Sequence, residues 1–159
     1  MKIFIIANSY WNIYNFRYSI IKKLIKEKHQ IFVLAPPDKF KPFLMNLNLT
    51  TIDITLKNNQ NFIFDIISLF KLFYLFVFYK PDYVFTFTIK PNLYASIASI
   101  FLKTKVICNI SGLGSSFLVK SYKRKLTFFL YKKFLKNSHH VFFQNNHDQK
   151  FLGLISILL

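Results

Sequence analysis

The sequence predicts a doubly wound α/β fold: one domain with a mostly parallel, Rossmann-like sheet. Three observations lead to this class. Apolar runs of strand length alternate with segments of helical periodicity along the whole chain. No Ser/Gly-rich linker or internal repeat interrupts the 159 residues, a length that suits one domain. Strands that are joined by helices favour right-handed crossovers, which produce a parallel sheet covered on both faces.

The composition supports a packed domain in a reducing compartment. Hydrophobic residues make up 53% of the chain, which excludes a disordered tail or a charged linker. The single cysteine, Cys108, excludes a disulfide scaffold and a zinc site built from cysteines. The four histidines have no cysteine partners, so no metal is expected. Cytoplasmic localisation is the prediction that fits best, with the chain peripheral at the inner face of the cytoplasmic membrane.

The first half of the chain supplies three strands. Residues 2–7 form a continuous apolar strand, and a helix over residues 14–28 follows. The apolar face expected on that helix consists of Phe16, Ile20, Ile21, Leu24 and Ile25. Residues 31–34 form a second buried strand, which is followed by a short helix. Residues 51–56 alternate between apolar and polar side chains, which predicts a half-exposed strand at a sheet edge.

Residues 62–79 are apolar enough to raise the question of a membrane span. Asn61, Asp65, Ser68 and Lys71 recur at spacings of three and four, so they form one polar stripe along the helix. Charges in hydrocarbon are costly. We therefore expect a well-buried amphipathic helix, with a transmembrane span as the alternative.

The second half adds three more strands. These are expected over residues 83–87, 105–110 and 141–144, and a helix from Pro91 to about residue 102 connects the first two. A basic helix over residues 120–136 precedes the sixth strand. In the common order 3-2-1-4-5-6, strands 1 and 4 border the crevice where ligands bind.

Common nucleotide and hydrolase motifs do not occur. The turn after the first strand, residues 7–11, contains no glycine, so the G-x-G-x-x-G fingerprint is missing. No P-loop is present, and the Gly112-Leu113-Gly114 segment does not match the nucleophile elbow. We expect no bound cofactor.

Polar residues concentrate at the predicted crevice. They are Asn8, Asn15 and Arg17 after the first strand, Thr86, Thr88, Lys90 and Asn92 at and after the fourth, and Gly112 and Gly114 after the fifth. Such residues also cap helices and form turns, which is the alternative interpretation. Arg17 and Lys90 are expected near helix N-termini, where anions are favoured.

The formal net charge of +16 indicates an anionic partner, although an AT-rich codon composition also explains many lysines. Only Arg17 and Arg124 are arginines, so specific nucleic-acid binding is not expected. The basic helix carries the residues predicted to face a membrane: Lys123, Arg124, Lys125, Lys132, Lys133 and Lys136. A solvated lysine face beside a broad core face is the equal alternative.

Four segments resemble the N-terminal domain of glycosyltransferase family 4, in the GT-B group. They are the opening strand with Asn8, residues 14–17 (YNFR), residues 81–92 (PDYVFTFTIKPN), and residues 109–114 (NISGLG) with the later residues 141–145 (VFFQN). The resemblance covers residues 1–146. It implies an acceptor-binding half of an enzyme that moves a sugar from a nucleotide-sugar donor to a lipid-linked or polysaccharide acceptor, with no required metal. The nine crevice residues would then bind the acceptor.

In that family a second domain with a Glu-x7-Glu pair binds the donor, whereas this chain has one glutamate, Glu27. The expectation is therefore that the donor-binding domain is absent and the chain is inactive alone. Residues 147–159 are interpreted as a truncated or aberrant tail without a partner element. Two alternatives remain. One is a noncatalytic membrane-surface adaptor subunit that presents lipid-linked acceptor to a separate donor-binding subunit. The other is an unrelated flavodoxin-like module.

Overall fold

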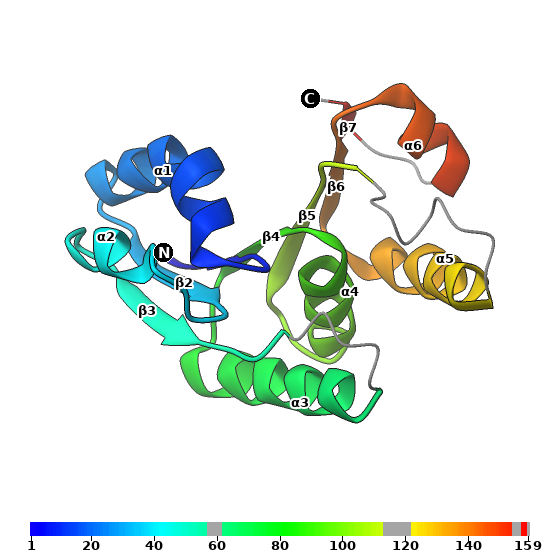
Figure 1. The fold of residues 1–159 in the computed structure, drawn as a ribbon, viewed down its shortest axis with the longest axis horizontal. Helices are drawn as coiled ribbons and strands as arrows, with labels where there is room; N and C mark the ends of the chain where they lie inside the picture. Colours follow the sequence, from blue (N-terminus) through cyan, green and yellow to red (C-terminus); the bar gives the residue numbers. More distant parts are fainter. Residues whose placement is uncertain (57–61, 113–121, 154–156, 159) are drawn as a thin grey trace.

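The structure of the chain is a computed structural model, and it describes residues 1–56, 62–112, 122–153 and 157–158 (Figure 1). Within these residues the strands are β1 (Lys2–Ile6), β2 (Gln30–Ala35), β3 (Thr50–Asp53), β4 (Tyr83–Phe87), β5 (Lys105–Ile110), β6 (His140–Phe143) and β7 (Ile157–Leu158). The helices are α1 (Tyr10–Lys26), α2 (Lys41–Met45), α3 (Phe62–Tyr79), α4 (Ile89–Ala98), α5 (Tyr122–Phe134), the short 3-10 turn Leu135–Asn137, and α6 (Asn146–Leu152).

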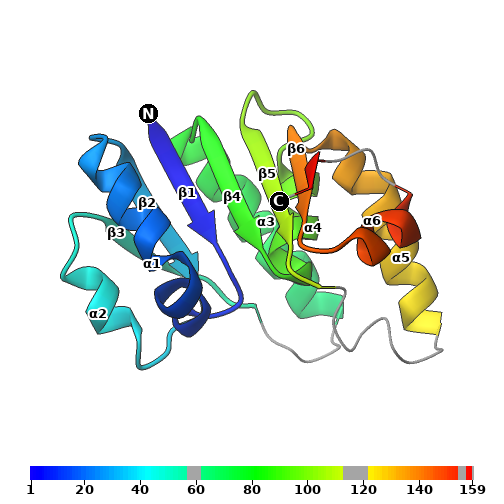
Figure 2. The ribbon, with the colours of Figure 1, turned by 90° about the horizontal axis from the view of Figure 1, so that it is seen from above.

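All strands are parallel, in the order β3-β2-β1-β4-β5-β6-β7. The predicted order 3-2-1-4-5-6 is therefore confirmed, and β3 lies at the sheet edge as expected. Figure 2 shows β1 and β4 side by side near the middle of the sheet. The doubly wound α/β class that the alternating pattern predicted is the observed one.

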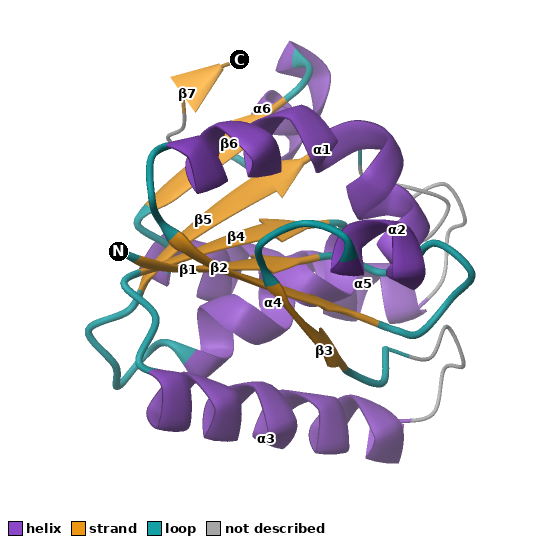
Figure 3. Cartoon of the chain, turned by 90° about the vertical axis from the view of Figure 1, so that its left-hand side faces the viewer, coloured by secondary structure: helices purple, strands orange, loops and turns teal. Residues whose placement is uncertain are grey.

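Helices cover both faces of the sheet, and each face has its own core. α1 and α2 lie on one face, and α3, α4 and α5 lie on the other (Figure 3). Successive side chains of a strand point to opposite faces. Ile3 and Ile5 therefore enter the core under α1, whereas Phe4 and Ile6 enter the core under α3 and α4. Strands that are buried on both faces explain why the apolar runs in the sequence are continuous rather than alternating.

Asp82 joins three strands at the amino edge of the sheet. Its backbone N–H donates to the Lys2 carbonyl over 2.9 Å, and its carboxylate accepts from the Lys2 N–H over 2.7 Å. Its carbonyl accepts from the Lys105 N–H over 3.1 Å. One residue before β4 therefore aligns the starts of β1, β4 and β5.

The first helix begins at Tyr10 rather than at residue 14, because Ser9 caps it. The Ser9 hydroxyl accepts from the Asn12 N–H over 3.1 Å. The predicted apolar face is correct at Ile21 but wrong at Phe16 and Ile20, which are exposed. Tyr10 and Ile13 are buried instead. Phe16, 56% exposed, packs edge-on against Trp11 with ring centroids 5.5 Å apart.

α3 is oriented differently from the well-buried helix that was predicted. Asn61 of the predicted polar stripe lies outside the described residues, and the other three members make contacts within the protein. The Ser68 hydroxyl is buried and donates to the Thr55 carbonyl and, over 2.7 Å, to the Phe64 carbonyl. The Lys71 ammonium donates to the Asp53 carbonyl over 2.8 Å. Many of its apolar side chains are exposed as a result. Among the described residues, no helix meets the length and hydropathy that a membrane span requires.

The expectation that the chain after Asp148 lacks a partner element is wrong for the described residues. The Asn145 side chain caps α6 by accepting from the Asp148 N–H over 2.8 Å. Leu152 is fully buried, and Gly153 ends the helix with a φ of 58°. β7 then pairs with β6. The domain limit at residue 146 stays a prediction.

Candidate functional site

The carboxyl ends of β1 and β4 meet at the point where the chain changes faces. α1 leaves β1 toward one face of the sheet, and α4 leaves β4 toward the other (Figures 1 and 3). In open α/β sheets, such a switch point leaves a crevice outside the strand ends that neither helix fills. The polar residues predicted for this crevice can therefore be located one by one.

Arg17 reaches the end of β4 from the middle of α1, not from a loop or a helix N-terminus as predicted. Its guanidinium carbon lies 4.1 Å from the centroid of the Phe87 ring, so the two planes form a cation–π contact. The Nε atom is buried and has no hydrogen-bond partner among the described residues. Burial lowers the pKa of Arg17. A half-buried guanidinium with an unused donor is suited to an anionic ligand.

Thr88, the residue after Phe87, adopts a strained backbone conformation. Its φ of 74° and ψ of 164° lie in a region that is almost restricted to glycine. Thr88 precedes α4, yet its hydroxyl makes no cap hydrogen bond and is buried without a partner among the described residues. Strain of this kind persists only where the surrounding structure fixes it, and it is frequent at binding sites.

Lys90 lies in the first turn of α4, as predicted, and forms an ion pair across the helix layer. Its ammonium lies 2.7 Å from the Asp65 carboxylate of α3, and both side chains are about 30% exposed. Asp65 also affects Tyr94 of α4: burial is the larger cause of the raised pKa of Tyr94, and the Asp65 carboxylate is the second. The Lys90 charge is thus already balanced within the protein, which leaves Arg17 as the better candidate for an anion.

Two predicted residues are buried below the crevice. Thr86 is fully buried and its hydroxyl donates to the Cys108 sulfur over 3.4 Å. Asn92 is 1% exposed and its amide donates to the Asn109 carbonyl over 3.1 Å. The first contact joins β4 to β5 and the second fixes α4 against β5, so Thr86 and Asn92 support the crevice from beneath.

The remaining predicted residues are more dispersed. Asn8 is exposed in the turn after β1. Asn15 is exposed on α1, where its amide donates to the Trp11 carbonyl over 2.9 Å. Gly112 follows β5 with a φ of 147°, a conformation that favours glycine. Within the described part of the chain, no atom beyond its chain neighbours lies within 4 Å of the position a Cβ would take. Gly114 lies outside the described residues.

A second polar cluster, at the ends of α1 and β3, was not predicted. The Tyr10 hydroxyl donates to Asp53 over 2.9 Å, and the Lys41 ammonium lies 2.6 Å from the same carboxylate. The hydrogen bond from Lys41 is the largest cause of the lowered pKa of Asp53. Burial, followed by Asp53, raises the pKa of Tyr10. The sequence marks Asp53 as a polar position of the alternating segment 51–56. Its partners could not be predicted, because Tyr10 and Lys41 come from other segments of the chain.

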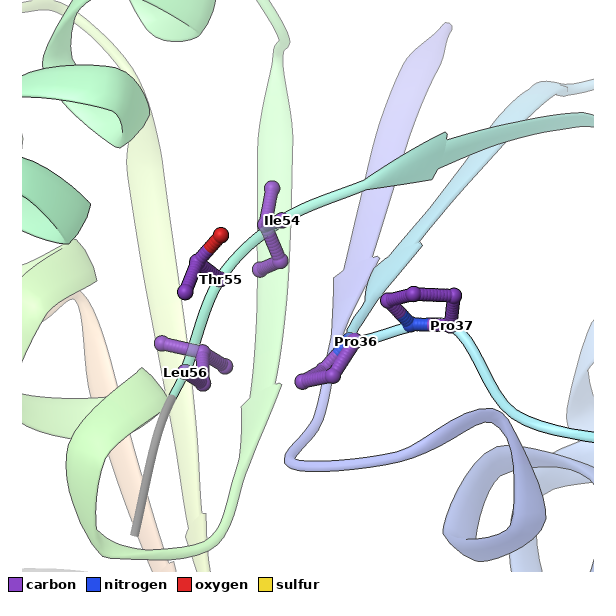
Figure 4. A pocket seen from close by; sticks show the side chains of 5 residues that line it. All are labelled: Pro36, Pro37, Ile54, Thr55 and Leu56. Carbon is purple, nitrogen blue, oxygen red and sulfur yellow. The ribbon is translucent and has the colours of Figure 1, made fainter. Parts of the chain in front are cut away.

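An apolar pocket opens at the same edge of the sheet, beside β2 and β3. Its volume is about 340 Å³, and Pro36, Pro37 and residues 54–56 line it. Figure 4 shows the two prolines facing Ile54 and Leu56 across the opening. The edge therefore offers apolar surface next to the polar groups described above.

Asn109 is a further residue that the sequence analysis did not select. It pairs in register with Phe87, is 9% exposed, and its side-chain oxygen has no partner among the described residues. The sequence does carry one sign of this residue, because Asn109 is polar and lies between the apolar Cys108 and Ile110 of β5. Among the described residues, no group of three or more His, Cys, Asp or Glu could hold a metal ion.

The basic helix α5 lies on the opposite side of α4 from α3 (Figure 1). Lys125, Lys132, Lys133 and Lys136 are exposed. Lys123 and Arg124 belong to α5, but their side chains lie outside the described part of the structure. Tyr131 is fully buried, and its hydroxyl donates to the Ile89 carbonyl over 2.9 Å, so α5 also anchors the start of α4.

Comparisons with known proteins agree with this architecture. A family model described as glycosyl transferase 4-like matches residues 2–145. An N-acetylgalactosaminyltransferase of Campylobacter jejuni that acts on N,N'-diacetylbacillosaminyl-diphospho-undecaprenol is 28% identical over 160 aligned residues. That alignment covers 96% of this chain and 42% of the relative.

Solved structures share the fold at low sequence identity. A glycosyltransferase from Rickettsia africae superposes with a TM-score of 0.72 at 12% identity, covering 99% of this chain and 42% of that one. A UDP-GlcNAc 2-epimerase from Methanocaldococcus jannaschii gives 0.65 at 19% identity, covering 96% and 42%. The chain thus spans less than half the length of these proteins. The fold alone does not separate transferases from epimerases, whereas the family model does.

Proposed function

Because this chain belongs to the glycosyl transferase 4-like family, as an N-terminal half of the GT-B fold, we propose that it binds the acceptor of a sugar-transfer reaction. The donor is a nucleotide sugar, and the acceptor is a lipid-linked glycan. The Campylobacter jejuni relative, which acts on a diphospho-undecaprenol substrate, supports this acceptor class. Donor binding belongs to a separate domain or subunit, so the chain alone transfers no sugar.

The observation that carries the proposal is Arg17. Its Nε is an unused, buried donor, and its guanidinium lies over Phe87, directly before the strained Thr88 and the N-terminus of α4. A diphosphate placed there receives a charge-assisted hydrogen bond from Arg17 and the favourable field of the helix terminus. Asn8, Asn15 and the Gly112 backbone are the candidates to contact the adjoining sugar.

Lys90 has a positioning role in this proposal. Its ion pair with Asp65 joins α4 to α3 and fixes the start of α4 beneath the ligand. Thr86 and Asn92 act from below in the same way, through Cys108 and the Asn109 carbonyl. Gly114 stays an untested member of the site.

The test is titration of a water-soluble diphosphate-sugar analogue into the purified chain. Charge-assisted hydrogen bonds contribute about 1.5–3 kcal/mol, so Arg17→Ala should weaken binding roughly tenfold to a hundredfold. Arg17→Lys keeps the charge but loses the Nε donor, and we expect it to recover only part of the affinity. Lys26→Ala, an exposed lysine on the same helix, is the matched control for loss of one charge. Equal affinity in Arg17→Ala and the control would place the acceptor elsewhere.

A second measurement separates the two functional classes. When a matching donor-binding half is supplied together with a nucleotide sugar, a split enzyme transfers sugar and the Arg17→Ala variant does so more slowly. A noncatalytic adaptor binds the acceptor with the same Arg17 dependence, but it stimulates transfer only by an already active subunit. Turnover by the 159-residue chain alone would contradict both.

A further inference from the structure

α3 presents an apolar face to the outside of the molecule. Its exposed large apolar side chains are Ile63, Ile66, Ile67, Phe70, Phe73, Tyr74, Val77 and Phe78. At 3.6 residues per turn these positions fall within an arc of about 140°, so they form one continuous stripe along the helix. Phe70 and Phe78 are 67% and 65% exposed. Figure 3 shows α3 on the outside of the molecule, on the far side of α4 from the sheet.

The orientation of α3 is fixed by its inward contacts. Leu72, Leu75 and Phe76 pack into the core, and Ser68 is buried beside them. The polar groups that could have faced water are used internally: Asp65 pairs with Lys90, and Lys71 donates to the Asp53 carbonyl. Rotating the helix to hide the stripe would break these bonds, so the apolar exposure is built into the fold.

Two further large apolar side chains are exposed in the turn between α4 and β5. Ile100 is exposed and Phe101 is 89% exposed. The Thr104 hydroxyl donates to the Pro81 carbonyl over 3.1 Å, which joins this turn to the end of α3. Single exposed apolar residues are ordinary, whereas a contiguous set of this extent marks an interaction surface.

We propose that this surface, the α3 stripe with Ile100 and Phe101, docks onto an anionic lipid bilayer. The charge of the chain favours a bilayer over a second copy of the chain. The chain carries a formal net charge of +16, so two copies repel each other, while an anionic surface attracts the protein. Lys80 and Lys103 are exposed in the turns that follow α3 and α4, where they can reach headgroups.

The mode of contact follows from the geometry of the helix. No described helix is long and apolar enough to cross a membrane. A helix with one apolar side and basic flanks lies in the interface, with its apolar side chains between the headgroups. The inference goes beyond the acceptor site, because docking requires no glycan. It also differs from the sequence-based prediction, which assigned membrane contact to α5.

The experiment uses vesicles of phosphatidylcholine with phosphatidylglycerol and the full 159-residue chain. The test variant replaces three side chains of the stripe without changing the net charge: Ile67→Gln/Phe70→Gln/Phe78→Gln. We expect it to lower the vesicle partition coefficient by about tenfold or more, because three large apolar side chains can no longer be buried in the bilayer. Phe43→Gln/Met45→Gln changes two exposed apolar residues of α2, on the other face of the sheet, and should bind like the wild type.

A fluorescent reporter keeps the test independent of the fold of the triple variant. Trp11 is the single tryptophan and lies on α1, so it is first replaced by phenylalanine. In that background Phe70→Trp should show a blue-shifted emission, quenched by brominated lipids, when vesicles are added. Phe43→Trp should show neither effect.

Three results would overturn the proposal. The first is a triple variant that binds vesicles like the wild type, or a Phe70→Trp reporter that lipid does not shift. The second is a Lys132→Glu/Lys136→Glu variant that no longer binds vesicles while the α3 variants bind like the wild type. That result assigns docking to α5. The third is a wild-type chain that ignores vesicles but dimerises through α3, which makes the stripe an interface between copies. Titration of the soluble acceptor analogue is unaffected by these outcomes, so failure of docking and failure of the acceptor site are distinguishable.

Discussion

Replacing Thr88 by glycine should stabilise the protein, although glycine usually destabilises. The Thr88 backbone, at φ 74° and ψ 164°, occupies a region that costs a residue with a Cβ about 1–3 kcal/mol. Glycine removes this strain but adds roughly 0.5–1 kcal/mol of conformational entropy to the unfolded chain. The hydroxyl makes no hydrogen bond to lose among the described residues. The net expectation is a gain of about 1 kcal/mol in the free energy of unfolding.

The measurement is chemical denaturation followed by circular dichroism, with thermal melts alongside. A gain of about 1 kcal/mol corresponds to a rise of roughly 2–4 °C in Tm for a chain of this length. Thr88→Ala is the control, because alanine loses the same hydroxyl and methyl but keeps the Cβ that causes the strain. If Thr88→Gly is no more stable than Thr88→Ala, the turn after β4 is not strained.

Two further predictions concern ion pairs at the same edge of the sheet. Asp65→Asn should lower the free energy of unfolding by up to about 1 kcal/mol, since the ion pair with Lys90 is partly exposed and screened. A double-mutant cycle with Lys90→Met measures the coupling free energy between the two side chains. A coupling free energy of zero contradicts the proposed positioning role of Lys90. The pKa of Asp53 is lowered in the folded protein, chiefly by the hydrogen bond from Lys41. The ionised carboxylate therefore stabilises the fold fully above the unfolded pKa of about 3.9, and this stabilisation is lost as the pH falls through the folded pKa. Asp53→Asn should therefore be less stable than the wild type at neutral pH and converge with it in acid, as urea denaturation at a series of pH values would show; a difference that is constant with pH contradicts this.

Much of the fold could be predicted because strand burial leaves a direct signal. Continuous apolar runs marked β1, β2 and β5, and the alternation around Ile52 correctly placed β3 at the edge. The helix faces were harder to predict. Phe16 and Phe70 are apolar and exposed, whereas Ser68 is polar and buried. In α3, tertiary hydrogen bonds from Ser68 and Lys71 to the segment at residues 53–55 help to fix which side of the helix faces inward.

The candidate site was predicted in its location but less well in its composition. Parallel topology places strand ends together, so the β1–β4 crevice followed from strand order alone. The pairing of Lys90 with Asp65, and of Asp53 with Tyr10 and Lys41, joins segments that are distant in sequence. No local pattern encodes such partners. Strain at Thr88 was equally hidden, because threonine gives no sign of a positive φ.

The hydrogen bonds of Asp82 to Lys2 and Lys105 affect which residues of the domain can change during evolution. β1 is apolar on both faces, so sliding it by one residue against β4 would exchange one apolar set for another, and hydrophobicity alone specifies its alignment weakly. The hydrogen bonds of Asp82 to Lys2 and Lys105 set that alignment from the amino edge. Substitutions at the opposite edge can therefore accumulate without misaligning the strands. If the crevice binds the acceptor as proposed, its residues can change there while the strand alignment is maintained at the amino edge.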